Sequence, residues 1–118
     1  MAWEIEFTYE FQVWYSTLTE REEEFVDSAV SRLEATGPAT PRPLVDTIKG
    51  SRFPNMKELR PPGGNLRILF AFDPRRSAIL LVGGDKTNQW NSWYEKAIPL
   101  ADSFYEEHLI TLRREGLI

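Results

Sequence analysis

Residues 55–73 have the sequence NMKELRPPGGNLRILFAFD, in which two strand-like segments flank a turn. The turn is Pro61-Pro62-Gly63-Gly64, and the segment after it alternates and is rich in aromatic residues. After a second turn at residues 73–76, the mostly apolar segment SAILLVGG follows, which is typical of a central strand. These residues predict a β-hairpin extended by a third antiparallel strand.

The N-terminal flank predicts one strand and two helices. WEIEFTY (residues 3–9) alternates between apolar and charged side chains, which indicates a strand. Thr8 is placed to cap a short helix through YEFQVWYSTL. Thr19 and Glu22 form the pattern of a capping box at the start of a longer helix, and Gly37-Pro38 ends it.

The remaining flanks are less regular. Residues 38–54 are rich in proline and predict an ordered loop with one or two turns. The last third predicts a short helix ending at Ala97 and a longer one with Pro99 in its first turn. In the longer helix one stripe is expected in the core and a second group near the chain end is expected to be partly exposed. The stripe is Leu100, Phe104, His108 and Leu112, and the exposed group is Leu109, Leu117 and Ile118.

The order of elements predicts an α+β fold with helices packed on one face of an antiparallel sheet. A chain of 118 residues has room for one hydrophobic core, so residues 1–118 are expected to form a single domain. Cysteine is absent, which excludes disulfides and zinc–thiolate sites and favours a reducing, cytoplasmic location. AILLV, the longest apolar run, is too short to cross a membrane, and the N-terminus lacks the apolar core of a signal peptide.

Charge is distributed unevenly along the chain. The net charge is −4, but residues 49–86 carry +5 and the remainder carries −9. A positive segment in an acidic protein is typical of a surface that attracts a polyanion, although solvated charge on exposed strands is an equally good interpretation. The basic residues of this segment are Lys49, Arg52, Lys57, Arg60, Arg67, Arg75, Arg76 and Lys86.

Several kinds of catalytic site are excluded by the residues present. Without cysteine and with one histidine, His108, on a predicted helix, neither a cysteine nucleophile nor a Ser-His-Asp triad is expected. GGDKT lacks the spacing of a phosphate-binding P-loop. The adjacent Glu22, Glu23 and Glu24 point around a helix, so they do not converge on a metal. No metal or cofactor is therefore expected.

Four basic residues lie on or next to the predicted strands: Lys57, Arg60, Arg67 and Lys86. Arg67 shares its strand face with Leu69 and Ala71, opposite an apolar trio expected to face the core. Guanidinium and ammonium groups on one sheet face bind phosphate and stabilise the charge of a phosphoryl transition state. The alternative, favoured by the pattern alone, is that Glu58 and Asp73 neutralise these cations in cross-strand pairs.

The chain resembles the RelE/HigB family of toxins from bacterial type II toxin–antitoxin systems, in its phage-derived HigB-like branch. The resemblance extends over essentially the whole chain and is carried by WEIEFT, GPATPRPLVDTIKGSRFPNMKELR, LRILFAFDPRRSAILLVGGDKT and WYEKAIPLADSFYEEHL. It implies a RelE-like fold and a ribosome-dependent endoribonuclease that cleaves mRNA without a metal ion. The 2′-hydroxyl group of the RNA would attack the adjacent phosphate.

The resemblance also implies site residues and partners. Lys57, Arg60, Arg67 and Lys86 would be catalytic, and the substrate-binding candidates are Arg75, Arg76, Trp90 and Tyr94. Trp90 and Tyr94 have a competing interpretation, because they recur at helical spacing with core positions. The family's C-terminal histidine or tyrosine has no aligned counterpart, so Tyr94 or His108 would have to fold back to replace it. The implied partners are a helix-turn-helix antitoxin from an adjacent gene, the ribosome and mRNA, with no membrane.

Two other functions stay open at this stage. A ParE-like inhibitor of gyrase would have the same fold and an antitoxin, but it would not need the cations. A degenerate phage-derived binding module would have no activity. Retention of all four cations favours the nuclease.

Overall fold

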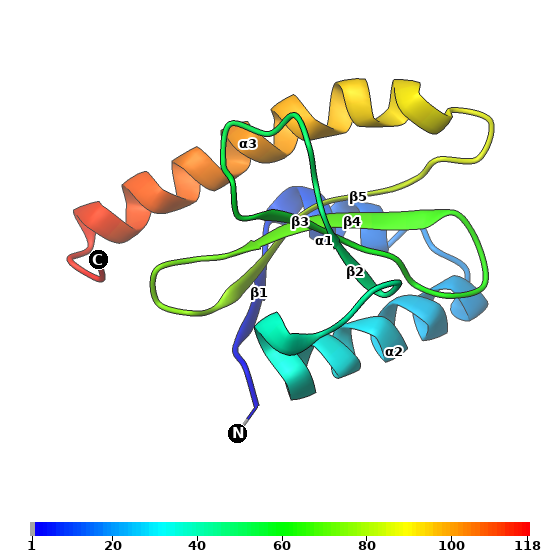
Figure 1. Cartoon of the computed structure of the whole chain (residues 1–118), viewed down its shortest axis with the longest axis horizontal. Coiled ribbons are helices and arrows are strands. Elements are labelled where there is room, and N and C mark those ends of the chain that lie inside the picture. Colours follow the sequence, from blue (N-terminus) through cyan, green and yellow to red (C-terminus); the bar gives the residue numbers. More distant parts are fainter. Residues whose placement is uncertain (1) are drawn as a thin grey trace.

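The computed structural model describes residues 2–118, whose centre is a five-stranded mixed sheet (Figure 1). The strands lie in the order β1-β5-β4-β3-β2, and every neighbouring pair is antiparallel except β1 with β5, which is parallel. The predicted hairpin and third strand are β3, β4 and β5. The strand bounds are β1 Ile5–Phe7, β2 Val45–Thr47, β3 Met56–Leu59, β4 Leu66–Phe72 and β5 Ala78–Asp85.

Three α-helices accompany the sheet: α1 (Tyr9–Tyr15), α2 (Glu20–Thr36) and α3 (Trp90–Arg114). The predicted N-terminal caps are confirmed. The Thr8 side chain accepts a hydrogen bond from the backbone N–H of Phe11, and Thr19 and Glu22 form the reciprocal bonds of a capping box. Gly37 ends α2 and begins a short 3₁₀-helix, η1 (Gly37–Ala39).

The helices cover both faces of the sheet, and this corrects the prediction of helices on one face. In Figure 1, α2 lies below the sheet and α3 above it. Alternate residues of β4 explain the difference: Ile68 and Phe70 pack in the core with α1 and α2, while Leu69 and Ala71 pack in the core with α3. The fold is therefore α+β as predicted, but the sheet is mixed and not fully antiparallel, because β1 runs parallel to β5. Two hydrophobic cores share this one sheet.

Two consecutive glycines in β5 allow a tryptophan to lie directly on each face of the sheet. A Cβ atom at Gly83 would collide with the ring of Trp14, and one at Gly84 would collide with the ring of Trp93. Each ring thus occupies the space that a side chain would otherwise fill. Trp93 anchors the start of α3 on the sheet in this way.

Two predicted elements differ in the structure. The proline-rich loop contains β2, which pairs with β3 at the edge of the sheet. Helix α3 is one continuous helix with Pro99 inside it, not two helices divided before Pro99. Pro99 has no N–H group, so the carbonyl of Glu95 loses its helical hydrogen bond. Both residues are exposed, so water can bond to this carbonyl, and packing before and after Pro99 holds the helix together.

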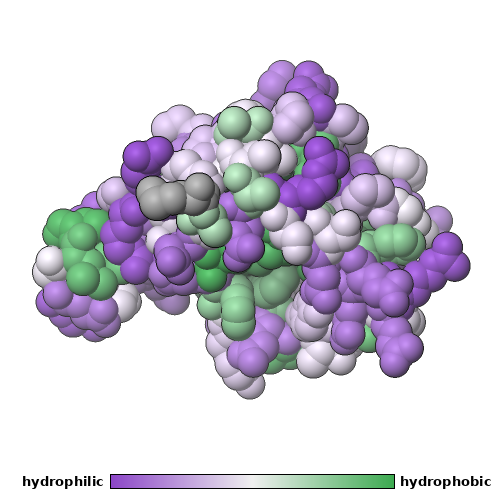
Figure 2. Space-filling model, turned by 90° about the horizontal axis from the view of Figure 1, so that it is seen from below, coloured by the Kyte–Doolittle hydropathy of each residue, from purple (hydrophilic) through white to green (hydrophobic). Residues whose placement is uncertain are grey.

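The buried stripe of α3 also differs from the predicted one. It consists of Trp93, Ala97, Ala101, Asp102, Tyr105 and Leu112. The side of α3 that faces the sheet is occupied by a series that starts at Trp93 and continues at intervals of four residues. Leu100 is not in this series and is exposed. Leu117 and Ile118 are exposed as expected, and Figure 2 shows hydrophobic side chains at the end of the molecule where α3 ends. Among the described residues, no helix combines the length and apolar character needed to cross a membrane.

Candidate functional site

Three of the predicted cations meet at the end of the sheet where α3 begins. Arg60 follows β3, Arg67 lies in β4, and Lys86 follows β5. The strand register brings them together, because Leu59 pairs with Ile68 and Arg67 pairs with Gly84. We call Arg60, Arg67 and Lys86 the cationic cluster.

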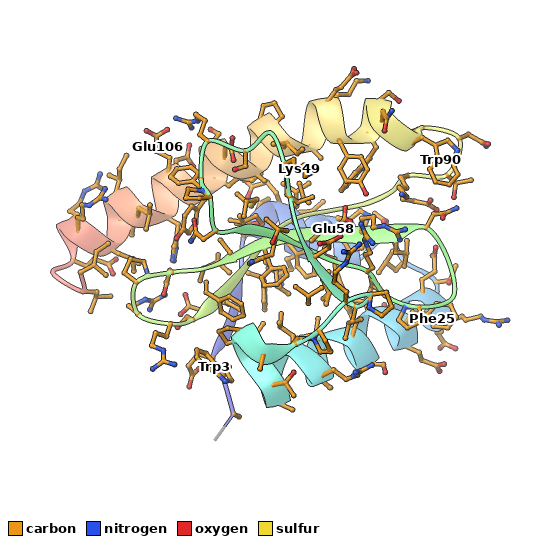
Figure 3. All side chains as sticks on the ribbon, viewed as in Figure 1. Trp3, Phe25, Lys49, Glu58, Trp90 and Glu106 are labelled. Atoms are coloured by element: carbon orange, nitrogen blue, oxygen red, sulfur yellow. The ribbon has the colours of Figure 1, made fainter. Side chains whose placement is uncertain are left out.

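Glu58 is a completely buried carboxylate beneath the two guanidinium groups of this cluster. Figure 3 shows it between the sheet and α3. Its Oε1 accepts a hydrogen bond of 2.6 Å from Arg60 Nε and lies 4.0 Å from Arg67 Nε. Within residues 2–118, Glu58 Oε2 and Arg67 Nε are buried without hydrogen-bond partners. The pair expected from the neutralisation hypothesis thus exists, but it leaves buried hydrogen-bonding capacity unused.

Arg60 is the more accessible of the two arginines. About a third of its side chain is exposed, and a second carboxylate, Asp46, lies 3.4 Å from it. The hydrogen bond to Glu58 raises the pKa of Arg60, although burial acts in the opposite direction. Arg67 is mostly buried and donates a hydrogen bond of 2.8 Å to the carbonyl of Leu66. Both side chains are therefore fixed in position before any ligand binds.

Lys86 differs because it contacts aromatic rings. Its Nζ lies 4.7 Å from the ring centroid of Trp90 and 5.5 Å from that of Tyr94. In the described part of the chain no carboxylate oxygen lies within 4.0 Å of this ammonium group. Burial and the nearby Arg67 lower the pKa of Lys86, while Glu58 partly opposes this effect. The ammonium group is thus free to pair with an anion and gives up its proton more readily than an ordinary lysine.

Two aromatic residues of the first turns of α3 complete the site. Tyr94 is partly buried, and burial together with the adjacent Glu58 raises its pKa to about 12. Its phenol therefore stays protonated at neutral pH. Trp90 is 62% exposed at the start of α3 (Figure 3). An exposed indole beside a free ammonium group is a suitable surface for a nucleic-acid base.

Lys57, one of the four candidate catalytic cations, does not belong to the cationic cluster. It alternates with Glu58 along β3 and shares its side of the sheet with Leu59, whose core is formed with α1 and α2. Its Nζ donates a hydrogen bond of 3.1 Å to Thr47 in β2. The face of Arg67 is also different from the expected solvent face, since α3 covers it.

Arg75 and Arg76 lie at the opposite end of β4, about 20 Å from the cationic cluster. Arg75 is held in ion pairs of 2.8 Å with both Asp73 and Glu6. Arg76 is exposed, and its guanidinium lies 4.7 Å from the ring of Trp3. The structure therefore separates these two predicted substrate contacts from Trp90 and Tyr94.

His108 belongs to this distant end as well. Its Nε2 lies 2.9 Å from the buried carboxylate of Asp73. Burial acts to raise the pKa of Asp73, but hydrogen bonds from His108 and Arg75 hold it below its ordinary value. The histidine thus fastens the second half of α3 to the β4–β5 turn, and it does not reach the cationic cluster. Residues 2–118 also contain no group of three or more acidic, histidine or cysteine side chains arranged to hold a metal ion.

The sequence pattern predicts Glu58 only as a neutralising partner of the cations. Glu58 is the buried centre of the site because α3 covers the face of β3 that carries it. The alternation of side chains along β3 does not show that a helix covers this face. Tyr94, in contrast, is a candidate from the sequence, because its helix needs only to pack on the cationic strands to bring the phenol to the site.

The fold of the chain is RelE-like, because solved structures of RelE and related proteins superpose on it. The isolated RelE toxin of E. coli superposes with a TM-score of 0.60 at 11% identity, covering 82% of this chain and 99% of that one. RelE in the RelE–RelB complex of Pyrococcus horikoshii OT3 gives 0.59 at 12% identity, over 73% and 97%. The E. coli DinJ–YafQ toxin–antitoxin complex gives 0.59 at 8% identity, over 76% and 99%.

Sequence comparison identifies the family. Residues 13–106 match the family described as "Phage derived protein Gp49-like (DUF891)". The chain is 50% identical over 96 residues to "Putative toxin HigB3" of Mycobacterium tuberculosis (strain ATCC 25618 / H37Rv), covering 81% of this chain and 84% of that protein. It is 48% identical over 99 residues to "Putative toxin HigB2" of the same strain, of which it spans about half (49%). The chain belongs to the phage-derived Gp49-like family and is a RelE/HigB-like toxin.

Proposed function

We propose that the protein is the toxin of a type II toxin–antitoxin system and that it cleaves mRNA on the ribosome. The observation that carries this proposal is the cationic cluster, with an unpaired Lys86 beside an exposed Trp90. The arrangement supports binding of an RNA phosphate next to a stacked base. Membership of the RelE/HigB-like toxins makes the ribosome and mRNA the targets to test, and the proposed place of action is the cytoplasm.

The proposed reaction is attack of an RNA 2′-hydroxyl group on the adjacent phosphate. The new bond joins the 2′-oxygen to phosphorus, and the bond from phosphorus to the 5′-oxygen breaks. The guanidinium groups of Arg60 and Arg67 stabilise the extra negative charge of the pentavalent transition state. Lys86, with its lowered pKa, donates a proton to the leaving 5′-oxygen. The proton of the 2′-hydroxyl group passes to water, so most of the rate enhancement comes from electrostatics, and no metal ion is used.

Of the two lysines that the resemblance implies are catalytic, Lys86 is the proposed proton donor. Lys57 is on the other side of the sheet, so it is left out of the proposed site. Arg75 and Arg76 are left out because they lie about 20 Å from the cationic cluster, at the opposite end of β4. The proposed substrate-binding residues are Trp90 and Tyr94.

An antitoxin is the proposed partner. Structural neighbours include the RelE–RelB complex of Pyrococcus horikoshii OT3, the RelB–RelE antitoxin–toxin complex of Methanococcus jannaschii and the DinJ–YafQ toxin–antitoxin complex of E. coli. A toxin of this class requires a neutralising protein, and we propose a helix-turn-helix antitoxin encoded by an adjacent gene.

The experiment compares Lys86→Ala with Lys57→Ala, which remove the same charge from opposite faces of the sheet. Each variant is added to translating ribosomes, and cuts in the bound mRNA are mapped by primer extension. We expect Lys86→Ala to lose at least about 100-fold in cleavage rate, the usual contribution of a positioned proton donor. Lys57→Ala is expected to stay within about twofold of the parent protein.

Growth arrest and DNA supercoiling are measured in parallel. Growth arrest with intact mRNA and altered supercoiling would contradict the nuclease hypothesis and support a gyrase inhibitor instead. A parent protein that neither arrests growth nor cuts mRNA would leave a binding module without activity.

A further inference from the structure

An apolar groove opens on the face of the molecule that α1 and α2 cover, which is the opposite face of the sheet from the cationic cluster. It has a volume of about 500 Å³. We call it the N-terminal groove. Its apolar lining comes chiefly from Ile5, Phe7, Phe11, Tyr15, Val26 and Val30.

The groove reaches the hydrophobic core because the elements around it are short. Strand β1 has three residues and no strand on its outer side, and α1 has only seven residues. Phe11 and Val26, which line the groove, are buried core residues, whereas Phe7 at its edge is 55% exposed. An exposed aromatic ring next to an open core marks a surface that a partner can cover.

The charges along α2 indicate what kind of partner fits. At 100° per residue, the acidic residues Glu20, Glu23, Asp27 and Glu34 lie on the side of α2 that faces the groove. The two arginines of α2, Arg21 and Arg32, lie on the opposite side, and Arg21 stacks on Phe25. The groove therefore has one edge that is uniformly negative.

The length of this edge favours a protein segment over a small molecule. From Glu20 to Glu34 it extends about 21 Å along the helix. A helix or extended segment with apolar residues on one side and lysine or arginine residues spaced along the other would match both the groove and its edge.

We propose that the N-terminal groove binds an apolar, positively charged segment of the antitoxin. The proposal rests on the proposed function for the identity of the partner, but the groove and its charge do not depend on the nuclease activity. A segment bound at this face does not cover the cationic cluster. Inhibition would therefore come from the rest of the antitoxin chain, which either covers the cluster or prevents the complex from fitting on the ribosome. The N-terminal groove is a different apolar surface from the exposed Leu117 and Ile118 at the C-terminus.

The first test reverses charge at the groove edge. The partner used is the purified product of the gene adjacent to this one, and its affinity is measured by calorimetry at low and high salt. Glu23→Lys/Glu34→Lys is expected to weaken binding at least about tenfold at low salt and to lose most of the salt dependence. The control Glu107→Lys/Glu115→Lys makes the same change in net charge at two exposed positions, one on α3 and one directly after it, and is expected to change affinity less than about twofold.

The second test removes apolar contact at either end of the molecule. Phe7→Ala shortens an exposed side chain at the groove, and Leu117→Ala does the same at the C-terminus. We expect at least about tenfold weaker binding for Phe7→Ala and no change for Leu117→Ala. Because both side chains are about half exposed, neither change should prevent folding, and thermal melting checks this.

Three results would overturn the proposal. One is equal loss of affinity in the groove and control variants, and another is loss only with Leu117→Ala. The third is absence of binding between the parent protein and the neighbouring gene product. If instead the protein alone forms oligomers that the groove variants dissociate, the occupant is a second copy of this chain. Cleavage of mRNA is measured separately, so failure of the proposed nuclease would not be mistaken for failure of the groove.

Discussion

Arg60 Nε donates a hydrogen bond of 2.6 Å to Glu58 Oε1, and Glu58 has no exposed surface. The carboxylate is also 4.0 Å from Arg67, so one buried negative charge holds two cations of the candidate site. Each guanidinium group would repel the other without it. The same residue that neutralises the cationic cluster therefore also allows it to form.

Glu58→Gln is expected to destabilise the fold by about 3 kcal/mol, because it leaves buried positive charge without its counter-charge. The measurement is urea denaturation at neutral pH. Glu107→Gln, at an exposed position on α3, serves as the control and should change the free energy of unfolding by less than about 0.5 kcal/mol. Equal effects in the two variants would mean that Glu58 is not needed to hold the arginines.

A second buried carboxylate, Asp73, predicts how stability depends on pH. Its pKa in the folded protein is below the ordinary value of 3.8, so the unfolded chain binds its proton first as the pH falls. The stabilisation from Asp73 is complete above the ordinary value and is lost as the pH drops through the lowered one. Asp73→Asn should therefore cost about 3 kcal/mol at neutral pH, with the difference from the parent protein shrinking in acid. A difference that stays constant across this range would refute the linkage.

The sequence allowed the caps at Thr8 and Thr19 to be predicted because a cap depends on neighbours three residues away. The faces of β3 and β4 could not be assigned in the same way. Alternation tells which residues share a face, as it did for Arg67 and Leu69, but not whether a distant helix covers that face. Since α3 covers it, Arg67 is mostly buried, and Lys57 on the other side is excluded from the site.

The division of α3 at Pro99 was wrong for a related reason. Proline disfavours the middle of a helix locally, but packing of Trp93 and Ala97 before it and Ala101 and Tyr105 after it outweighs that preference. Strand β2 was missed because three residues carry too little periodicity. Its pairing with β3 exists only in the folded sheet.

Trp93 and Trp90 are expected to respond differently to the same substitution. Trp93 is 8% exposed and packs on Gly84, so Trp93→Ala should lower the free energy of unfolding by about 3–5 kcal/mol. Trp90→Ala, at an exposed position, should change stability by less than about 0.5 kcal/mol but slow mRNA cleavage, since Lys86 loses its aromatic neighbour. Thermal melting and primer extension separate the two effects. A stable Trp93→Ala variant without activity would reverse this assignment.

Lys86 predicts a loss of activity at alkaline pH. Its ammonium group must be protonated to donate to the leaving oxygen, and its pKa is lowered in the folded protein. The cleavage rate should therefore fall with rising pH earlier than an ordinary lysine with a pKa of 10.5 would allow. Lys86→Arg keeps the charge but cannot release its proton in this range, so it should be slower and should lack this alkaline decline. An identical decline in the variant would assign the titration to another group.

The acidic character of the whole protein predicts that the ribosome is needed to present the RNA. The protein has a net charge of −4, and the proposed site offers three cations, those of the cationic cluster, to phosphates. Its affinity for free single-stranded RNA should therefore be low. A plot of the logarithm of the RNA-binding constant against the logarithm of the salt concentration should have a slope of about −2, which corresponds to three phosphate contacts on a single strand. The measurement is cleavage and filter binding of one mRNA, free or on ribosomes, with Lys86→Ala as the control. Cleavage at physiological salt is expected only on ribosomes. Rapid cutting of the free RNA, abolished by Lys86→Ala, would show that the cluster alone is enough to select and position its substrate.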